Sequence, residues 1–550
     1  MTFVLLGDDT VLEPEFIVAA HTSADVPGAL ARLQAALDDG YYAAGFFAYE
    51  LGYVLEPKLA ARLPKNQTLS LLWFAVSRDL TTKPIPGGPY TLGPAAAVTD
   101  EAAYLPRCRT VLDAINAGEI YQANLTIRAR MPFTGDPAGL YADLRRRQPG
   151  PYGGMIQTPE FSVLSLSPEL FVQVTGNDIL TKPMKGTAPR GITPALDEAQ
   201  KTYLQTDTKQ RAENLMIVDL MRNDLGRIGT NIRVPELFAV ETHRTLHQMT
   251  SDVRATLKTD RIDDMLRAIF PAGSITGAPK IRAMEIISDL EDTPRGVYCG
   301  AFGLLHKGTS WLNVAIRTLT IQDGMAEIGI GSGVVADSDP ASEYAECLLK
   351  MKFLNAQDKD FALIETFRFD NGYTLMDEHM ARLRHSCDLL GFPAPAITFP
   401  TPDAPCVVRL QYEVDGTYTF TTRALPENKT LRYAIADARL DPDQPLLFHK
   451  TTRRDLYDRP NPEGVDEMLY CNTRGELCEG ARTNIFIDDG TGTLLTPALS
   501  CGLLPGTLRA RLLADGKARE AVLTVESLKS ARRVYLGNAV RGLVLAASSC

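Results

Sequence analysis

The polar stretch Asn-Ala-Gln-Asp-Lys-Asp at residues 355–360 divides this chain into two parts, for which we expect two separate cores. It follows a helix-like run and precedes a strand-like one. The 550 residues are also too many for a single domain, because domains usually contain roughly 100–200 residues. We therefore predict a main boundary near residue 358, with one domain over residues 1–357 and a second over 358–550.

Strand-like and helix-like segments are mixed in the first part without strict alternation, which favours an α+β fold over a doubly wound parallel sheet. Strands are predicted over 161–166, 169–174, 312–321 and 326–330, and helices over 104–117, 209–222, 261–270 and 341–354. Asp339 and Pro340 form an N-cap and first-turn pair for the last of these helices. The stretches 81–94 and 391–405 are rich in Pro and Gly and predict loops, the second dividing the C-terminal domain into two lobes.

Composition excludes several classes of protein. Acidic residues number 67 against 57 basic ones, and the net charge of −10 argues against a nucleic-acid binder. No apolar run approaches the ~20 residues of a membrane helix, and no signal-peptide pattern is visible at the start. The nine cysteines include no CxxC pair, which supports neither a disulfide framework nor a zinc site. We expect a cytoplasmic protein without a membrane partner.

Eight polar or glycine-rich segments follow one another in the first part. They are GEIYQANLT (118–126), SLSPELF (165–171), TKPMKGTAPRG (181–191), AENLMIVDLMRNDLGR (212–227), GSITGAPKIRAME (273–285), VAIRTL (314–319), GIGSGVVADS (329–338) and SEYAE (342–346). Singly, most would be solvated loops or helix faces. In this order they resemble the chorismate-utilising enzymes, which include anthranilate synthase component I, aminodeoxychorismate synthase component I and isochorismate synthase. The resemblance implies an α/β sandwich domain like that of anthranilate synthase component I, with a catalytic core over about residues 100–355.

The resemblance implies a site for chorismate, a small dianion, with Mg²⁺ as cofactor. Glu213 and Glu346 match the metal ligands of the family and Glu343 lies close by, in keeping with the oxygen donors that Mg²⁺ prefers. Arg317 would clamp the enolpyruvyl carboxylate in a two-pronged contact. His247 matches the histidine proposed to protonate the departing hydroxyl.

Further positions would surround the same substrate. They are Gly186, Thr187, Tyr298 and the backbone of Gly331, Ser332 and Gly333. Glycine permits close backbone approach, and bare N–H groups suit an anion. Gln210 lies one helical turn before Glu213, where anthranilate synthases have a carboxylate, so a weaker outer metal shell is expected here.

Lys185 distinguishes among the members of this group. It stands before the glycine of Pro-Met-Lys-Gly-Thr, where anthranilate synthases have alanine. Lysine there is typical of aminodeoxychorismate synthase component I, in which it is thought to attack the ring and expel the 4-hydroxyl before ammonia adds at C4. Glu169 matches a second catalytic position, and a simple carboxylate clamp is the alternative for Lys185. No GxCxG motif is visible, so the resemblance implies a separate glutamine amidotransferase partner.

The second part resembles the fold-type IV pyridoxal-phosphate enzymes, among them branched-chain aminotransferase, D-amino-acid aminotransferase and aminodeoxychorismate lyase. The resemblance is carried by the segments EHMARL (378–383), FHKTT (448–452), TRGELCEG (473–480) and LPGTLR (504–509). It implies a two-subdomain α+β fold and pyridoxal 5'-phosphate as cofactor. The implied contacts are Lys450 as the cofactor lysine, Glu479 at the pyridine nitrogen, Arg382 with the N–H groups of Thr507 and Leu508 as the phosphate cup, and Asn538 as a further contact.

Both resemblances together predict a bifunctional enzyme that makes 4-aminobenzoate for folate from chorismate. Lys450 would serve as cofactor anchor and as base. One alternative is an anthranilate synthase component fused to a branched-chain or D-amino-acid aminotransferase, against which Lys185 argues. Another makes the second part a non-catalytic docking module, against which Lys450, Glu479 and Arg382 argue. Fold analogy alone predicts a homodimer through the second domain.

Overall fold

The computed structural model describes residues 2–243, 246–355, 361–455 and 457–549. The chain forms two compact units, one made of Met1–Pro189 with Lys201–Gln357 and the other of Arg190–Gln200 with Asp358–Cys550. The boundary predicted near residue 358 lies outside the described residues. In the part of the chain that is described, no helix is both long and apolar enough to cross a membrane.

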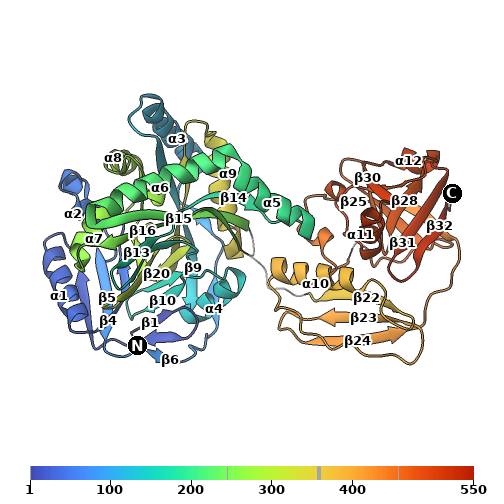
Figure 1. Cartoon of the computed structure of the whole chain (residues 1–550), viewed down its shortest axis with the longest axis horizontal. Coiled ribbons are helices and arrows are strands. Elements are labelled where there is room, and N and C mark those ends of the chain that lie inside the picture. Colours follow the sequence, from blue (N-terminus) through green and yellow to red (C-terminus); the bar gives the residue numbers. More distant parts are fainter. Residues whose placement is uncertain (1, 244–245, 356–360, 456, 550) are drawn as a thin grey trace. The chain divides into compact units, whose positions relative to one another are not determined.

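The first unit contains two large antiparallel sheets (Figure 1). One has 11 strands in the spatial order β17 (Gly277–Ala278), β9 (Gln122–Gly135), β21 (Met325–Val334), β20 (Thr318–Gln322), β11 (Ser162–Ser165), β10 (Gly154–Gln157), β1 (Phe3–Leu6), β2 (Thr10–Leu12) and β6 (Thr81–Thr82), with β7 (Tyr90–Leu92) and β8 (Ala96–Ala97) on β9. The other has 10 strands in the order β14 (Met184–Pro189), β16 (Leu246–Leu257), β13 (Asp178–Thr181), β12 (Leu170–Thr175), β19 (Thr309–Val314), β18 (Ala301–Leu305), β4 (Tyr42–Phe47), β5 (Leu72–Ser77) and β3 (Phe16–Ala20), with β15 (Gly229–Thr242) on β16.

Helices cover the outer face of each sheet. The 10-stranded sheet packs against α1 (Val26–Asp38), α2 (Leu51–Leu55), α6 (Thr208–Ile228) and α7 (Ile262–Ile269). The 11-stranded sheet packs against α3 (Glu101–Asn116), α4 (Pro137–Arg147), α8 (Lys280–Leu290) and α9 (Pro340–Met351). The first unit is therefore an α/β sandwich, as the sequence predicts.

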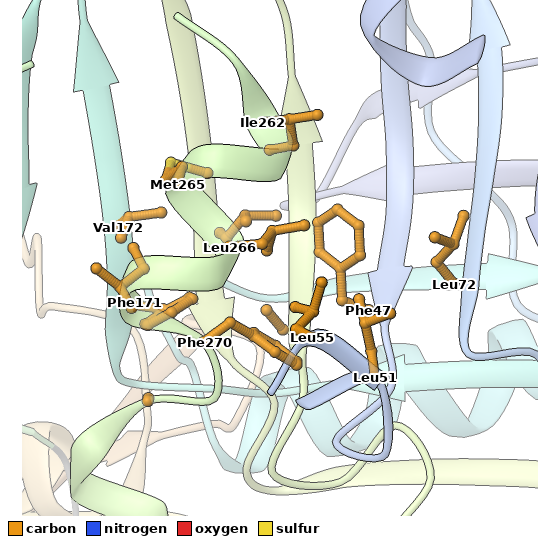
Figure 2. Packing of buried hydrophobic residues seen from close by; sticks show 14 of the residues in the cluster. Phe47, Leu51, Leu55, Leu72, Phe171, Val172, Ile262, Met265, Leu266 and Phe270 are labelled. Carbon is orange, nitrogen blue, oxygen red and sulfur yellow. The ribbon is translucent and has the colours of Figure 1, made fainter. Parts of the chain in front are cut away.

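The period-two alternation of strand side chains explains how one sheet serves two cores. Phe46 of β4 packs in the cluster between the sheets, whereas its neighbour Phe47 packs in the cluster under the helices. Figure 2 shows Phe47 beside Leu51 of α2, with Leu266 of α7 and Phe270 in the same cluster. Strands buried on both faces read as continuous apolar runs, and β4 and β5 have this character.

Part of the loop predicted over residues 81–94 is wrong, because the short strands β6 and β7 lie within it. The single strand predicted over residues 312–321 is also wrong. The chain leaves β19 of one sheet at Val314 and enters β20 of the other sheet at Thr318. Arg317 adopts a left-handed backbone with φ of 49° at this crossing, so the strand cannot continue. Apolar periodicity cannot reveal such a break, because both strands are buried. The other predicted strands and helices overlap the observed elements, and Ser342 N donates to Asp339 Oδ2 at 2.9 Å as expected of the N-cap.

The second unit has two lobes of α+β structure (Figure 1). The smaller holds β22 (Leu363–Phe369), β23 (Cys406–Tyr412) and β24 (Tyr418–Arg423) with α10 (Met376–Leu390). The larger is a mixed sheet in the order β27 (Leu477–Gly480), β26 (Glu467–Asn472), β25 (Leu431–Leu440), β32 (Gly542–Ser548), β31 (Arg533–Asn538), β28 (Asn484–Asp488), β29 (Leu494–Pro497) and β30 (Ala518–Ala521), with α11 (Thr507–Ala514) and α12 (Val525–Ser530). The loop at 391–405 connects α10 to β23 within the smaller lobe, so the lobes divide after β24 instead.

Residues Arg190–Gln200 belong to the second unit although they lie in the first half of the sequence. They include the first turns of α5 (Pro194–Thr206). Arg190 donates to Asp197 at 2.9 Å and to Asp388 of α10 at 2.5 Å. These paired charges hold the segment against α10.

Candidate active sites

The backbone around Lys185 is fixed by two buried polar side chains. Lys185 lies on β14, where the register with β16 shifts and Gly186 has φ of 89°. Asn214 Nδ2 of α6 donates to Lys185 O at 3.3 Å, and Ser251 Oγ donates to Asn214 Oδ1 at 2.6 Å. This network leaves the Lys185 side chain to project from a rigid base.

The electrostatic surroundings of the Lys185 amine favour its neutral form. Burial lowers the pKa of Lys185, and the nearby charge of Lys350 lowers it further. Glu213, Glu169 and Glu346 oppose this effect and lie close enough to act on the amine. A lysine is nucleophilic only when it is neutral, so this site provides the condition for covalent attack.

Glu169 supplies a carboxyl group that titrates near neutral pH beside Lys185. It precedes β12 and is almost completely buried. Burial raises its pKa to about 7, against the opposing effects of a hydrogen bond from Ser274 Oγ (2.7 Å) and the charge of Lys185. A group with this pKa can accept and release protons under ordinary conditions.

His247 is fully buried on β16, next to the turn after Lys185. Its Nδ1 lies 3.0 Å from Thr242 Oγ1 on the paired strand β15. The neighbouring Gln248 Nε2 donates to Gly186 O at 2.8 Å, and Thr187 Oγ1 donates to Gln248 Oε1 at 3.2 Å. Gln248 therefore joins the two residues after Lys185 to the strand that carries His247.

Arg317 is a partly buried cation without a carboxylate partner among the described residues. Its left-handed backbone lies between β19 and β20, and Leu166 N donates to its carbonyl at 3.1 Å. Burial alone lowers the pKa of Arg317 to about 10. An unpaired, partly buried guanidinium and a strained backbone are both features of binding sites, and together they indicate a place for an anionic ligand.

The glycines of β21 make room for Lys185. A Cβ atom on Gly333 would lie 2.9 Å from Lys185 Nζ, and one on Gly331 would lie 2.9 Å from a backbone oxygen of β9. The hydroxyl of Ser332 instead lies 3.0 Å from Tyr104 OH on α3, so only the backbone of Ser332 can serve a ligand. The amine of Lys185, which belongs to the 10-stranded sheet, therefore lies beside β21 of the 11-stranded sheet.

Tyr298 packs against the same strand. A Cβ atom on Gly329 would lie 2.0 Å from the Tyr298 ring, and the Arg128 guanidinium lies 5.2 Å from the ring centroid. Burial raises the pKa of Tyr298 well above its usual value, so its hydroxyl stays protonated. Its predicted contact with the substrate stays a prediction.

The three predicted metal ligands lie on α6 and α9. Burial raises the pKa of Glu213, and the charges of Glu343 and Glu346 raise it further. Ser338 Oγ donates to Glu343 at 2.6 Å, and Lys350 Nζ lies 2.6 Å from Glu346. Among the described residues, no group of three or more His, Cys, Asp or Glu side chains is arranged to hold a metal ion. The oxygen donors and their mutual repulsion nevertheless fit Mg²⁺, which commonly takes only one or two protein carboxylates.

Three polar residues near Lys185 were missed by the sequence analysis. Lys350 Nζ donates to Gly331 O at 2.9 Å. Lys350 stands four residues after Glu346 on a helix, and this spacing could have predicted its ion pair with Glu346. Gln122 Nε2 and Thr250 Oγ1 are buried without a hydrogen-bond partner among the described residues. Gln122 belongs to the recognised segment 118–126, whereas Thr250 lies outside the eight segments, and nothing in the sequence reveals that their polar atoms are left unpaired.

Lys450 provides a second amine with a lowered pKa, in the other unit. Its carbonyl accepts a hydrogen bond from Ile364 N of β22 at 2.7 Å. Burial lowers the pKa of Lys450 to about 7; Arg382 lowers it further and Glu365 raises it. A substantial fraction of this lysine is therefore neutral at physiological pH, as a lysine that condenses with a carbonyl compound requires.

Glu479 ends β27 and is held from two sides. Tyr457 OH donates to Oε1 at 2.8 Å, and Leu504 N donates to Oε2 at 3.1 Å. Burial raises the pKa of Glu479 to about 7. A carboxylate fixed in this way can accept a proton from a ring nitrogen.

Arg382 lies beside the N-terminus of α11, and the sequence predicts a phosphate cup made of both. The helix begins at Thr507, immediately after Gly506, where a Cβ atom would lie 1.9 Å from Asn484 Oδ1. The first N–H groups of a helix suit a phosphate, and Arg382 adds a buried cation. Thr507 and Leu508 supply those N–H groups. A partly buried lysine, a carboxylate and this cup fit pyridoxal phosphate.

Asn538 has a structural role that the sequence does not reveal. Its Nδ2 donates to Arg482 O at 3.0 Å, and its Oδ1 accepts from Val540 N at 3.0 Å. The oxygen of the amide therefore stabilises the turn between β31 and β32, and its nitrogen joins this turn to the loop between β27 and β28. The predicted cofactor contact of Asn538 stays a prediction.

Comparison with known proteins agrees with both halves. Residues 87–356 match the family described as chorismate binding enzyme, and residues 406–548 match amino-transferase class IV. The chain is 44% identical to aminodeoxychorismate synthase component 1 of Klebsiella aerogenes over 252 residues, covering 45% of this chain and 56% of that protein. It is 38% identical to the protein of the same name from Salmonella typhimurium over 343 residues, covering 56% of this chain and 75% of that protein.

The fold of the first unit is also known. The crystal structure of anthranilate synthase component I from Streptococcus pneumoniae TIGR4 matches with a TM-score of 0.55 and 25% identity, over 65% of this chain and 92% of that one. The chain thus belongs to the family of chorismate-binding enzymes that includes aminodeoxychorismate synthase component 1. Its second unit has the fold of the class IV aminotransferases, a pyridoxal-phosphate-dependent class. The chain spans little more than half of the Klebsiella relative.

Proposed function

We propose that the first unit converts chorismate and ammonia into 4-amino-4-deoxychorismate, and that the second unit, with pyridoxal phosphate, releases 4-aminobenzoate and pyruvate. The observation that carries this proposal is the pair of partly buried lysines, Lys185 and Lys450, each with a pKa lowered by burial and each among groups suited to its task. A lysine at position 185 disfavours the alternative of an anthranilate synthase fused to an aminotransferase, because that synthase has no use for an amine beside the ring.

The first reaction would begin with attack on the ring by neutral Lys185, whose proton passes to Glu169. His247 would protonate the 4-hydroxyl, which leaves as water as the ring–nitrogen bond forms. Ammonia then forms a bond at C4 while the bond between the ring and Lys185 breaks. Glu169 returns its proton to the departing amine, and the new ammonium group gives one proton to His247, so that Lys185, Glu169 and His247 regain their starting states. Arg317 would hold the enolpyruvyl carboxylate throughout. Glu213 and Glu346 would hold Mg²⁺, which supplies positive charge to the ring carboxylate.

The second reaction requires removal of a proton from C4 of the amino compound. Lys450 is placed to act as the base because its pKa of about 7 leaves much of it neutral. Pyridoxal phosphate supplies an electron sink when it is bound. Glu479 would hold the proton at its ring nitrogen, while Arg382 and the α11 N-terminus fix its phosphate. Loss of the enolpyruvyl group, released as pyruvate, leaves an aromatic ring.

The ammonia would come from a separate glutamine amidotransferase subunit. With free ammonium salts the chain should act alone. We place it in the cytoplasm, where cysteines such as the buried Cys299 and Cys478 stay reduced.

The deciding experiment is incubation of the protein with chorismate, ammonium, Mg²⁺ and pyridoxal phosphate, with the products separated. Accumulation of 4-aminobenzoate and pyruvate supports both steps. Without pyridoxal phosphate, 4-amino-4-deoxychorismate should accumulate instead. Formation of anthranilate would refute the assignment.

Replacement of Arg317 should weaken substrate binding. We expect Arg317→Met to raise the KM for chorismate by roughly 10- to 100-fold, because a charged hydrogen-bonding pair is lost from a buried site. Steady-state kinetics at saturating ammonium would measure the change. Arg254→Met is the matched control, since Arg254 pairs with Asp178 at the surface (2.8 Å). Equal KM values for Arg317→Met and the wild type would exclude Arg317 from the site.

Glu169 should give the first reaction a pH dependence near neutrality. Its carboxylate, the form that accepts the proton of Lys185, predominates above its pKa of about 7. The rate of chorismate consumption, measured at constant free ammonia, should therefore rise with pH around a midpoint near 7. In Glu169→Gln the rate should be lower and this rise should be absent. A rise that persists unchanged in the variant would mean that another group controls it.

A further inference from the structure

A buried carboxylate, Glu365 on β22, lies directly behind the arginine of the phosphate cup. Glu365 is 1% exposed and Arg382 of α10 is 9% exposed. Arg382 Nε donates to Glu365 Oε1 at 2.9 Å, and its NH2 donates to Oε2 at 2.6 Å. Despite its burial, the charge of Arg382 and the hydrogen bonds from Arg382 and His379 hold the pKa of Glu365 at about 2, so it remains an anion.

The pairing with Glu365 selects which edge of the Arg382 guanidinium faces outward. A guanidinium has five N–H donors in one plane. Two of them bind Glu365, and a third, on NH1, donates to Pro505 O at 3.2 Å. Of the two donors that remain, one belongs to each terminal nitrogen. They stay available for a two-pronged contact with a phosphate.

The same carboxylate sets the hydrogen-bond direction at Thr507. His379 Nδ1 lies 2.6 Å from Glu365 Oε2 and must carry a proton to donate to it. Burial lowers the pKa of His379, so the ring is neutral and its Nε2 is an acceptor. Thr507 Oγ1, at 3.4 Å from Nε2, therefore donates to His379. Thr507 then offers its backbone N–H, and not its hydroxyl proton, to a phosphate.

We propose that Glu365 is a positioning residue for the phosphate end of the cofactor site, which aims Arg382 directly and fixes the Thr507 hydroxyl through His379. The inference rests on the proposed use of pyridoxal phosphate by the second unit. Glu365 also faces the cofactor lysine, whose pKa it raises. One residue thus links the phosphate end of the site to the reactive end.

The test is direct measurement of pyridoxal phosphate binding to the full chain carrying Glu365→Gln. Glutamine keeps the size of the side chain, but removes the charge and points an N–H₂ group at donors. We expect the Kd for pyridoxal phosphate to rise about 10- to 100-fold, the range that loss of a supporting contact commonly causes. Glu526→Gln is the matched control, because Glu526 pairs with Lys529 at the exposed surface of α12, and its Kd should be unchanged. An unchanged Kd in Glu365→Gln would overturn the proposal.

A second readout separates positioning from a merely structural role. Without the Glu365 charge, the pKa of Lys450 should fall below about 7. The pH midpoint at which added pyridoxal phosphate develops its visible absorbance should therefore move to lower pH. If the midpoint stays in place and only the melting temperature falls, Glu365 merely stabilises the fold and the proposal is wrong.

A further variant keeps the test decisive. Should Glu365→Gln fail to fold, Glu365→Asp retains the buried charge but cannot reach both Arg382 and His379, and it should still raise the Kd. If the wild type binds no pyridoxal phosphate, the proposed function of the second unit fails instead.

Discussion

Replacing Lys185 by alanine should lower the rate of 4-amino-4-deoxychorismate formation by about 10³-fold or more, a loss typical of removing a covalent nucleophile. The variant loses the amine together with the aliphatic chain that carries it, and the neighbours Glu169 and Gly333 remain. The lyase reaction, assayed with added 4-amino-4-deoxychorismate, should keep its wild-type rate because Lys450 belongs to the other unit. Chromatographic separation of both products would measure the two rates in one preparation.

Lys182→Ala is the matched control for this experiment. Lys182 lies three residues earlier and pairs with Glu241, so its removal should leave the rate of the first reaction nearly unchanged. The kinetic pattern also decides between two roles of Lys185. A fall in kcat supports covalent attack, whereas a higher KM with normal kcat would indicate that Lys185 only clamps a carboxylate.

Replacing Lys450 by alanine should stop the second reaction and let its substrate accumulate. We expect 4-aminobenzoate formation to fall by about 10³-fold or more, because the variant loses both cofactor anchor and base. The visible absorbance of the protein with added pyridoxal phosphate should disappear. Chorismate should still be consumed at the wild-type rate, so that 4-amino-4-deoxychorismate builds up.

Lys429→Ala serves as the control for the second experiment, since Lys429 pairs with Asp466 at the surface (2.6 Å). It should retain both the absorbance and the 4-aminobenzoate rate. A wild-type protein that stays colourless with added pyridoxal phosphate would favour the docking-module alternative. If the Lys450→Ala variant still develops the visible absorbance, another lysine binds the cofactor.

The fold class could be predicted because most elements have local signals. Asp339 and Pro340 mark the start of α9, because the Asp339 side chain accepts a hydrogen bond from a free N–H group of the first turn and the proline ring suits the first helical position. The segments around Lys185 and Lys450 likewise identify chemistry from residue types in a short stretch. Predictions of this kind depend on neighbours in sequence, which are fully visible.

Features that depend on distant partners could not be predicted. The break at Arg317 arises because β19 and β20 join different sheets, and the apolar pattern continues across it. The grouping of Arg190–Gln200 with the second unit depends on pairing of Arg190 with Asp388, almost 200 positions away. Glu365 has no unusual sequence context, and its importance becomes visible only when Arg382 and His379 are placed against it.

The passage of the chain from one sheet to the other at Arg317 ties ligand binding to the order of folding. Lys185 extends from the 10-stranded sheet and Gly333 lies in the 11-stranded one, while Arg317 lies in the crossover between the two sheets. A folding intermediate in which only one sheet has formed therefore contains no site. Chorismate, if it binds as proposed, stabilises only the fully assembled sandwich and leaves such intermediates unaffected. Protection by the ligand against proteolysis would then report the docking of the two sheets and not the formation of either alone.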